Sequence, residues 1–155
     1  MRIGVPKEIY EGECRVATTP DVAAQLMKLG FDVTVESGAG AKSSFSDDAY
    51  RDAGCDVVAT AADLWSQSDV VMKVRGPDDA EAARLRSDQT LSSFLWPGPN
   101  PELLEKRTRT WATLLAMDSV PRISSAQKMD ALSSMAIIAG YRAVVEAAPH
   151  FGRFF

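Results

Sequence analysis

Two kinds of segment alternate along the chain when its hydrophobic and polar positions are marked. Short runs rich in β-branched residues are followed by stretches with apolar residues every three or four positions, which is typical of βα units in a parallel sheet. Strands are predicted at residues 2–5, 32–36, 56–58, 69–74, 90–95 and 113–117. Because connections between parallel strands are right-handed, we expect a doubly wound α/β fold of the flavodoxin/Rossmann-like three-layer class, with a mostly parallel sheet.

Helix signals fill the intervals between these strands. Thr19 can cap a helix that begins at Pro20 and ends before Gly30. The predicted buried stripe of this helix is Val22, Leu26 and Leu29. Shorter helices are predicted at residues 46–54, 61–66, 78–85 and 100–107.

A long helix is predicted at residues 125–151, near the end of the chain. Its predicted apolar face consists of Leu132, Met135, Ala136 and Ala139. The terminal aromatic residues Phe154 and Phe155 follow it. Exposed aromatics in this position indicate either a chain that was cut short, which we favour, or a surface that docks on a partner.

The composition is that of one soluble domain. Of 155 residues, 46% are hydrophobic and 25% are charged, and the net charge of -4 argues against a nucleic-acid-binding surface. Cys14 and Cys55 are the two cysteines, and without a secretory segment before them we expect a reducing cytoplasm. No run reaches the roughly 18 to 20 apolar residues of a membrane span, so we expect no direct membrane insertion. A lone histidine, His150, argues against a catalytic triad or a multi-histidine zinc site.

A glycine-rich stretch, ESGAGAKS, occupies residues 36–43 after the second predicted strand. It does not match a Walker phosphate loop, because Ala41 precedes Lys42 where glycine is required. It does not match a dinucleotide-binding fingerprint either, because Ser43 stands where glycine or alanine is needed. We therefore predict a turn with positive φ and close backbone approach.

Three cations are predicted at the carboxyl edge of the sheet, where ligands bind in open α/β folds. Arg15 lies in the loop after the first strand, and Lys73 and Arg75 end the fourth strand. Such cations suit an anionic group, and arginine can hold a carboxylate through two parallel bonds. The alternative is that they form surface salt bridges of little energy with the acidic residues Glu8, Glu11 and Glu13. The pattern alone favours neither interpretation.

A polar segment joins the last strand to the long helix. Gln127, Asp130 and Ser134 fall on one helical stripe, and Arg122 lies on the incoming loop. An amide, a carboxylate and a guanidinium suit a neutral polar ligand such as a carboxamide. The alternative, which the pattern alone favours, is a capping box in which Ser124 and Gln127 serve the amino terminus of the helix.

Several segments together resemble one family, the amino-terminal domain shared by the alpha subunit of proton-translocating nicotinamide nucleotide transhydrogenase and by alanine dehydrogenase. The matching segments are RIGVPKE at 2–8, RVATTP at 15–20, KVR at 73–75, MDSVPR at 117–122, QKMDALSSM at 127–135 and AGYR at 139–142. They span nearly the whole chain, and the resemblance is greater to the transhydrogenase branch.

This resemblance implies a role in binding NAD(H). The family has a loop, matched here by Arg122, Gln127, Asp130 and Ser133, that lies against the nicotinamide end of NAD(H). There it positions NAD(H) for hydride transfer to NADP(H) on a separate domain. Direct hydride transfer requires two aligned rings and no acid or base on the donor, so a polar loop suffices. The resemblance thus reverses the preference for a capping box.

Other positions depart from the family or separate its branches. Trp96 stands where alanine dehydrogenases carry a catalytic histidine, whereas Arg15 and Lys73 match the residues that hold the substrate carboxylate in those enzymes. Ile137 replaces an asparagine of the family. Pro149 replaces a histidine and should kink or end the long helix.

We interpret residues 1–124 as the α/β domain and residues 125–155 as a helix leading to an NAD-binding Rossmann domain that the chain lacks. The expected protein is part of a transhydrogenase, a homodimer with NADP-binding and membrane-spanning partners, cytoplasmic and peripheral to the inner membrane. The chain alone is expected to be inactive and to bind NADH poorly. The alternatives are an alanine dehydrogenase-like amino acid oxidoreductase domain and a noncatalytic α/β interaction module.

Overall fold

The computed structural model describes residues 1–98 and 112–152. The chain divides into two compact units, Met1–Ala116 and Met117–Phe155, each of which is described by itself. The helix predicted at residues 100–107 and the terminal residues 154 and 155 lie outside the described residues.

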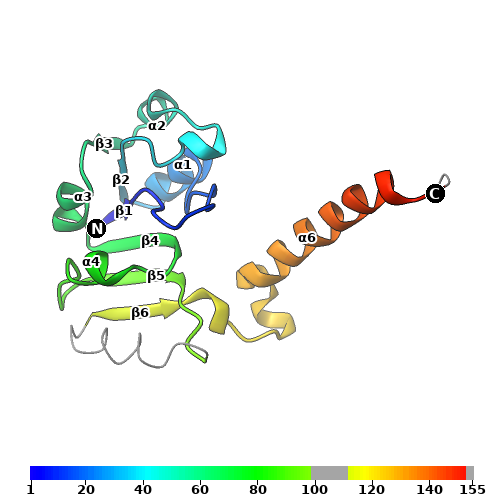
Figure 1. Cartoon of the computed structure of the whole chain (residues 1–155). Coiled ribbons are helices and arrows are strands. Elements are labelled where there is room, and N and C mark those ends of the chain that lie inside the picture. The colour runs from blue at the N-terminus through cyan, green and yellow to red at the C-terminus, as the bar shows by residue number, and fades with distance from the viewer. Residues whose placement is uncertain (99–111, 153–155) are drawn as a thin grey trace. The chain divides into compact units, whose positions relative to one another are not determined.

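All six predicted strands are present, each within one residue of its expected ends. They are β1 (Arg2–Val5), β2 (Asp32–Glu36), β3 (Asp56–Val58), β4 (Val70–Arg75), β5 (Thr90–Phe94) and β6 (Thr113–Ala116). Neighbouring strands are parallel throughout, in the order β3-β2-β1-β4-β5-β6 (Figure 1). Parallel sheets are buried on both faces, which explains why these strands are short apolar runs in the sequence.

Helices cover both faces of the sheet. Those of the first unit are α1 (Pro20–Lys28), α2 (Asp47–Asp52), α3 (Ala61–Gln67) and α4 (Asp79–Ala82). Helices α1 and α2 share a buried cluster with Val5 of β1, and α3 shares a second cluster with Val71 of β4. The neighbouring Gly4 faces Leu64 of α3, and successive strand residues point to opposite faces, so the two clusters lie on opposite sides of the sheet. The predicted three-layer architecture is confirmed.

The first helix begins where the sequence predicts but buries a different stripe. Thr19 Oγ1 accepts the Val22 N–H at 3.4 Å and caps the helix. Leu26 packs against the core as predicted, whereas Val22 and Leu29 are 43% and 74% exposed and Ala23 is fully buried. The prediction of Val22 and Leu29 as core residues was wrong. The small Ala23 side chain allows the helix to approach the sheet closely, so the contact face is centred on it.

The glycine-rich stretch forms the predicted turn. Gly38 has a φ of +76°, a conformation that favours glycine. Its N–H donates to Asp47 at 2.8 Å, and the Ser37 hydroxyl donates to the same carboxylate at 2.6 Å. The anion that the loop binds in this structure is therefore the carboxylate of Asp47, a residue of the chain itself.

The long helix of the second unit is shorter than the sequence predicts. The unit contains 3-10 turns at Met117–Ser119, Ser124–Met129 and Ala148–His150, and helix α6 at Ala131–Ala147. Asp130 has φ -78° and ψ 88°, which interrupts helical geometry before α6. The prediction of one helix from residue 125 to 151 was therefore wrong at its start. Pro149 lies in the final 3-10 turn, so the expectation that it ends the helix is confirmed.

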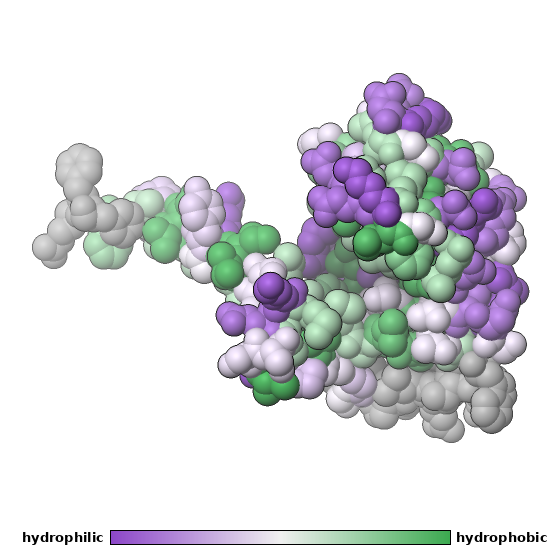
Figure 2. Space-filling view, turned by 180° about the vertical axis from the view of Figure 1, so that it is seen from behind, coloured by the Kyte–Doolittle hydropathy of each residue, from purple (hydrophilic) through white to green (hydrophobic). Residues whose placement is uncertain are grey.

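None of the residues of helix α6 is buried. Ile137, Ile138, Tyr141 and Val144 are 59–74% exposed, and at 100° per residue they lie opposite the predicted apolar face. The predicted one-sided amphipathic pattern was wrong, because these four apolar residues lie opposite the predicted face. Hydrophobic residues are visible on the face of α6 that Figure 2 shows.

One segment, Ala131–His150, is long and apolar enough to cross a membrane by length and composition. This corrects the expectation that no such run exists. Arg142 and Glu146 form an ion pair within this segment. A single helix of this kind is weak evidence of a membrane span, so no insertion is inferred from it.

Substitution of Gly4 by alanine should destabilise the first unit. An added Cβ would lie 2.0 Å from Ser68 Oγ and 2.9 Å from Leu64 Cδ2. We expect the free energy of unfolding in urea to fall by about 1–3 kcal/mol, the usual cost of overpacking. Gly98→Ala, whose added Cβ would meet no described atom within 4 Å, is the control. Equal stability of Gly4→Ala and the wild type would contradict the close approach of α3 to β1.

Candidate functional site

The order of the strands reverses between β1 and β4, which makes the carboxyl edge of these two strands the switch point of the fold. The two strands pair over a short stretch near their starts and then separate. Past that stretch, the Glu8 carboxylate accepts the N–H groups of Val74 at 2.6 Å and of Arg75 at 3.4 Å. A side chain thus supplies acceptors to backbone donors that a paired strand would otherwise satisfy.

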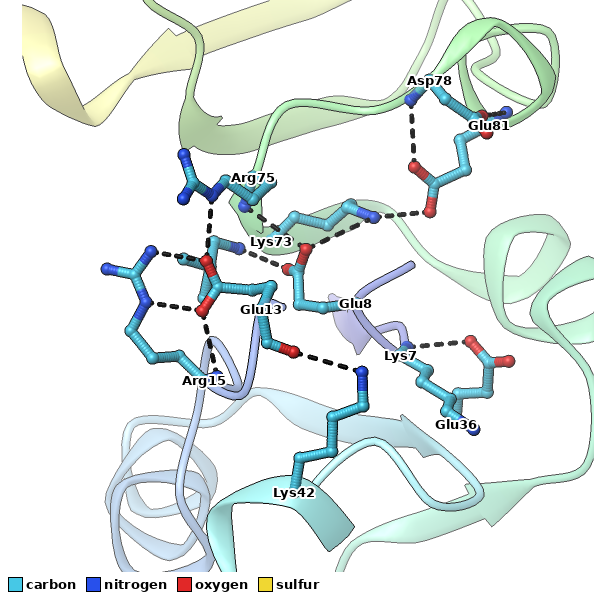
Figure 3. A network of polar contacts seen from close by, with 11 residues as sticks. Lys7, Glu8, Glu13, Arg15, Glu36, Lys42, Lys73, Arg75, Asp78 and Glu81 are labelled. Atoms are coloured by element: carbon cyan, nitrogen blue, oxygen red, sulfur yellow. Dashed lines mark hydrogen bonds and ion pairs between the residues drawn. The ribbon is translucent and has the colours of Figure 1, made fainter. Parts of the chain in front are cut away.

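Lys73 lies beside Glu8 with its side chain fully buried. Its Nζ is 2.5 Å from Glu81 Oε1 and 3.8 Å from Glu8 Oε2 (Figure 3). Glu81 is held in place at the start of α4 by a capping box with Asp78, in which each side chain accepts the other's backbone N–H. The helix cap therefore fixes the carboxylate that neutralises the buried lysine.

The three residues form a buried cluster of one cation and two carboxylates. Burial raises the pKa of Glu8 above its ordinary value, and Lys73 and the two backbone N–H groups partly oppose that shift. A buried ion pair balances a large desolvation cost only when its geometry and hydrogen bonds are complete. We call Glu8, Lys73 and Glu81 the switch-point cluster.

A second carboxylate, Glu13, binds two arginines next to the switch-point cluster. It accepts Arg15 Nε at 2.7 Å, Arg15 Nη2 at 2.6 Å and Arg75 Nε at 2.9 Å (Figure 3). These bonds, those from Arg15 above all, lower the pKa of Glu13 to about 2. The Arg75 guanidinium carbon also lies 4.9 Å from the centroid of the Tyr10 ring. The loop after β1 is thereby tied to the end of β4.

A pocket of about 610 Å³ opens at the switch point. It is lined by residues 8–11 after β1, by residues 73 and 75–78 around the end of β4, and by residues 94–96 at the end of β5. Trp96 has a φ of +50°, in the left-handed region. For a bulky side chain this conformation costs about 1–3 kcal/mol.

The structure therefore pairs the predicted cations with the acidic residues of the β1 loop. Arg15 and Arg75 do pair with Glu13 of this loop, but the side chains of Glu13 and Lys73 are buried, so these pairs are not the weak surface salt bridges of the alternative. Sequence reasoning missed Glu81, although the spacing from Asp78 to Glu81 is itself a capping-box signal. Within the described ranges, no group of three or more His, Cys, Asp and Glu is placed to hold a metal ion.

The predicted polar loop residues of the second unit line one pocket. Its volume is about 250 Å³, and its lining consists of Arg122, Ile123, Ser124, Gln127, Asp130 and Ser133. We call it the loop pocket. The sequence thus grouped Arg122, Gln127, Asp130 and Ser133 correctly in space, and their role in binding a cofactor stays a prediction. Ser134 does not line this pocket.

Asp130 is the organising residue of the loop pocket. One carboxylate oxygen accepts the N–H groups of Leu132 at 3.1 Å and Ser133 at 3.2 Å, which caps α6. The other accepts the Ser133 hydroxyl at 2.5 Å and lies 3.9 Å from Arg122 Nε. These contacts, led by the hydroxyl, lower the pKa of Asp130. The carboxylate is therefore ionised and held in one orientation.

Gln127 differs from Asp130 in that its side-chain amide makes no hydrogen bond to a described residue. Ser124 lies inside the 3-10 turn Ser124–Met129, and no side chain caps that turn. The capping box predicted from Ser124 and Gln127 is therefore absent, because Asp130 serves as the cap of α6 instead. The common helical stripe of Gln127, Asp130 and Ser134 is also absent, because Gln127 precedes the helix.

Known proteins resemble the chain over nearly its full length. The sequence model of the family described as "Alanine dehydrogenase/PNT, N-terminal domain" matches residues 4–139. NAD(P) transhydrogenase subunit alpha of Cereibacter sphaeroides is 63% identical over 155 residues, which are 100% of this chain and 30% of that protein. Alanine dehydrogenase of Mycolicibacterium smegmatis is 32% identical over 99% of this chain and 41% of its own length.

A solved structure supports the same relationship. The crystal structure of transhydrogenase from Sinorhizobium meliloti superposes with a TM-score of 0.92 and 40% identity, over 99% of this chain and 46% of that one. The chain therefore spans less than half the length of these relatives.

Loss of the Glu13 carboxylate should remove a pH-dependent part of the stability. The pKa of Glu13 is lowered from 4.5 to about 2 in the folded chain. The Glu13 charge therefore contributes to the free energy of unfolding above pH 4.5, and this contribution is lost as the pH falls through 2. We expect Glu13→Gln to lower the free energy of unfolding by about 1–3 kcal/mol at pH 7, and by progressively less as the pH approaches 2.

Urea unfolding at several pH values would measure this difference. Glu11→Gln, an exposed carboxylate of the same loop, is the matched control and should have little effect. A pH-independent loss in Glu13→Gln would show that Glu13 acts through packing and not through its charge.

Proposed function

Because the chain belongs to the alanine dehydrogenase/PNT N-terminal domain family, we propose that it is the first α/β domain of an NAD(P) transhydrogenase alpha subunit. In this role it positions NAD(H) for hydride transfer to NADP(H) held by another domain. The observation that carries the proposal is the loop pocket, which gathers the four residues that resemble the nicotinamide-binding loop. The chain is also 63% identical to the Cereibacter sphaeroides transhydrogenase subunit, against 32% for the Mycolicibacterium smegmatis alanine dehydrogenase.

The loop pocket has the donors and acceptors that a carboxamide requires. An amide ligand needs an acceptor for its N–H groups and a donor for its carbonyl oxygen. Gln127 carries both in one side chain, which makes no hydrogen bond to a described residue, and Arg122 adds a donor. These residues therefore fit the nicotinamide end of NAD(H). When bound, NAD(H) supplies the hydride, and the net reaction converts NADH and NADP⁺ into NAD⁺ and NADPH.

The residues of the loop pocket act by orientation. Hydride transfer between two nicotinamides takes up and releases no proton, so neither a general acid nor a general base is required. Asp130 is fixed by the α6 cap and by Ser133, so the backbone that carries Gln127 is anchored at its carboxyl side. A rigid loop lowers the entropic cost of aligning two rings.

Arg15 and Lys73 take a structural role in this proposal. Arg15 is engaged by Glu13 through three hydrogen bonds, and Lys73 is engaged by Glu81. Their carboxylate partners thus come from the chain itself instead of from a substrate. They hold the loops at the switch point in place.

The complete protein would act within a larger assembly. We propose a homodimer with NADP-binding and membrane-spanning components, cytoplasmic and peripheral to the inner membrane through those partners, with hydride transfer coupled to proton movement. The name "subunit alpha" of the Cereibacter sphaeroides relative supports the existence of partner subunits.

Replacement of Gln127 tests the loop pocket in the complete subunit. We expect Gln127→Ala to slow single-turnover hydride transfer from NADH by about 10- to 100-fold while the Kd for NADH rises by less than about tenfold, because alignment is lost more than binding. Stopped-flow absorbance and calorimetry measure the two quantities.

Ser134→Ala is the matched control, because Ser134 is a nearby polar residue that does not line the loop pocket. Hydride transfer at the wild-type rate in Gln127→Ala would rule out the proposed role of Gln127.

A further inference from the structure

A third pocket, of about 500 Å³, opens between helices α1 and α2, which pack on the same face of the sheet (Figure 1). It is lined by residues 20, 21 and 24 of α1, by residue 45 before α2, and by residues 49, 52 and 53 at α2. We call it the α1–α2 pocket. It shares no lining residue with the pocket at the switch point or with the loop pocket, so the proposed function does not account for it.

The floor of the α1–α2 pocket is apolar and held in place. Apart from two aspartates, its lining consists of one proline, three alanines and Phe45. The Phe45 N–H donates to Gly40 O at 3.0 Å, and the Phe45 ring meets the ring of buried Tyr50 edge-on, with the centroids 6.4 Å apart. The Tyr50 hydroxyl donates to Thr18 O at 2.8 Å. This floor can therefore accept an apolar side chain without a further ordering cost.

The two aspartates, Asp21 and Asp52, are exposed, and neither forms an ion pair or a side-chain hydrogen bond with a described residue. Asp21 lies in the first turn of α1, where the helix dipole favours an anion, but Asp52 is the last residue of α2, where the dipole disfavours one. The neighbouring cation Arg51 pairs with Asp48 at 2.6 Å instead. The described part of the chain thus gives Asp52 no stabilising partner.

An apolar floor beside two carboxylates is complementary to a basic and apolar ligand. Nucleic acids and anionic membranes carry negative charge, which the carboxylates repel. A protein segment with an apolar side chain between basic residues matches both the floor and the charge. Partly exposed ion pairs add little affinity, but they favour such a segment over an acidic one.

We propose that the α1–α2 pocket is a docking site for a partner protein, which inserts an apolar side chain between the two helices and pairs flanking lysine or arginine residues with Asp21 and Asp52. This inference goes beyond the proposed function, because docking here requires neither NAD(H) nor the loop pocket.

A pentapeptide with blocked ends, Arg-Gly-Leu-Gly-Arg, is the probe. Alternate side chains of an extended peptide point to the same side, so its leucine and both arginines can face the pocket together. In saturation-transfer NMR with the complete subunit, we expect the leucine methyl groups to be the most strongly saturated protons, with a Kd near about 1 mM. Alanine in place of leucine should weaken binding by at least about tenfold, because less apolar area is buried.

Variants of the complete subunit locate the binding site. Asp21→Asn and Asp52→Asn should each weaken binding of the leucine peptide by about two- to fivefold at low salt, as expected for partly exposed ion pairs. Ala49→Leu, which fills the pocket from α2, should abolish binding; if this variant does not fold, the two aspartate variants decide. Asp32→Asn is the matched control, because Asp32 is an exposed carboxylate of the first unit that does not line the pocket.

Three results would overturn the proposal. They are no saturation of the leucine peptide by the folded wild type, equal binding of the alanine peptide, and binding by both aspartate variants as tight as that of Asp32→Asn. Sedimentation tests a second copy of the chain as the occupant. We expect the wild type and Ala49→Leu to have the same oligomeric state, and dissociation of a folded Ala49→Leu variant would assign the pocket to an interface between copies instead.

Discussion

A buried lysine between two carboxylates, at the point where two parallel strands separate, is the constraint on which the first unit depends. Glu8 satisfies backbone donors of β4, Lys73 compensates the charge of Glu8, and the α4 cap holds Glu81 against Lys73. Each contact needs the next, because removing one member of a buried ion pair typically costs about 3–5 kcal/mol. The pocket at the switch point is lined by Glu8 and Lys73 of this arrangement.

The second unit uses one carboxylate for two tasks. Asp130 begins α6 and, through the Ser133 hydroxyl and nearby Arg122, also shapes the loop pocket. A residue that caps a helix cannot reorient without loss of the first helical turn, so its position is held by the folding of α6. Gln127, by contrast, makes no side-chain hydrogen bond to a described residue. The loop pocket therefore combines a rigid support with a side chain that is available to a ligand.

The strands were predictable from sequence because β-branched runs between turn residues have few other interpretations. The buried face of α1 was not predictable from sequence. A stripe that contains Val22 and a stripe that contains Ala23 both have helical spacing, and only contact with the sheet decides which one is buried. The grouping of Arg122, Gln127, Asp130 and Ser133 came from a family resemblance. Local spacing pointed instead to a capping box, which the structure replaces with Asp130. The burial of Lys73 depends on Glu81, which lies eight residues further along the chain in α4. The capping-box spacing marks Glu81 as a helix cap, but neither strand nor helix periodicity predicts its contact with Lys73.

The most direct test of the account asks whether the loop pocket meets the nicotinamide of NAD(H). In the complete subunit, the side-chain amide resonance of Gln127, assigned by its loss in Gln127→Ala, is followed during titration with NADH and with NADPH. The account predicts a shift that saturates with NADH binding and is absent with NADPH. An unchanged resonance at saturating NADH, with binding established by calorimetry, would contradict it.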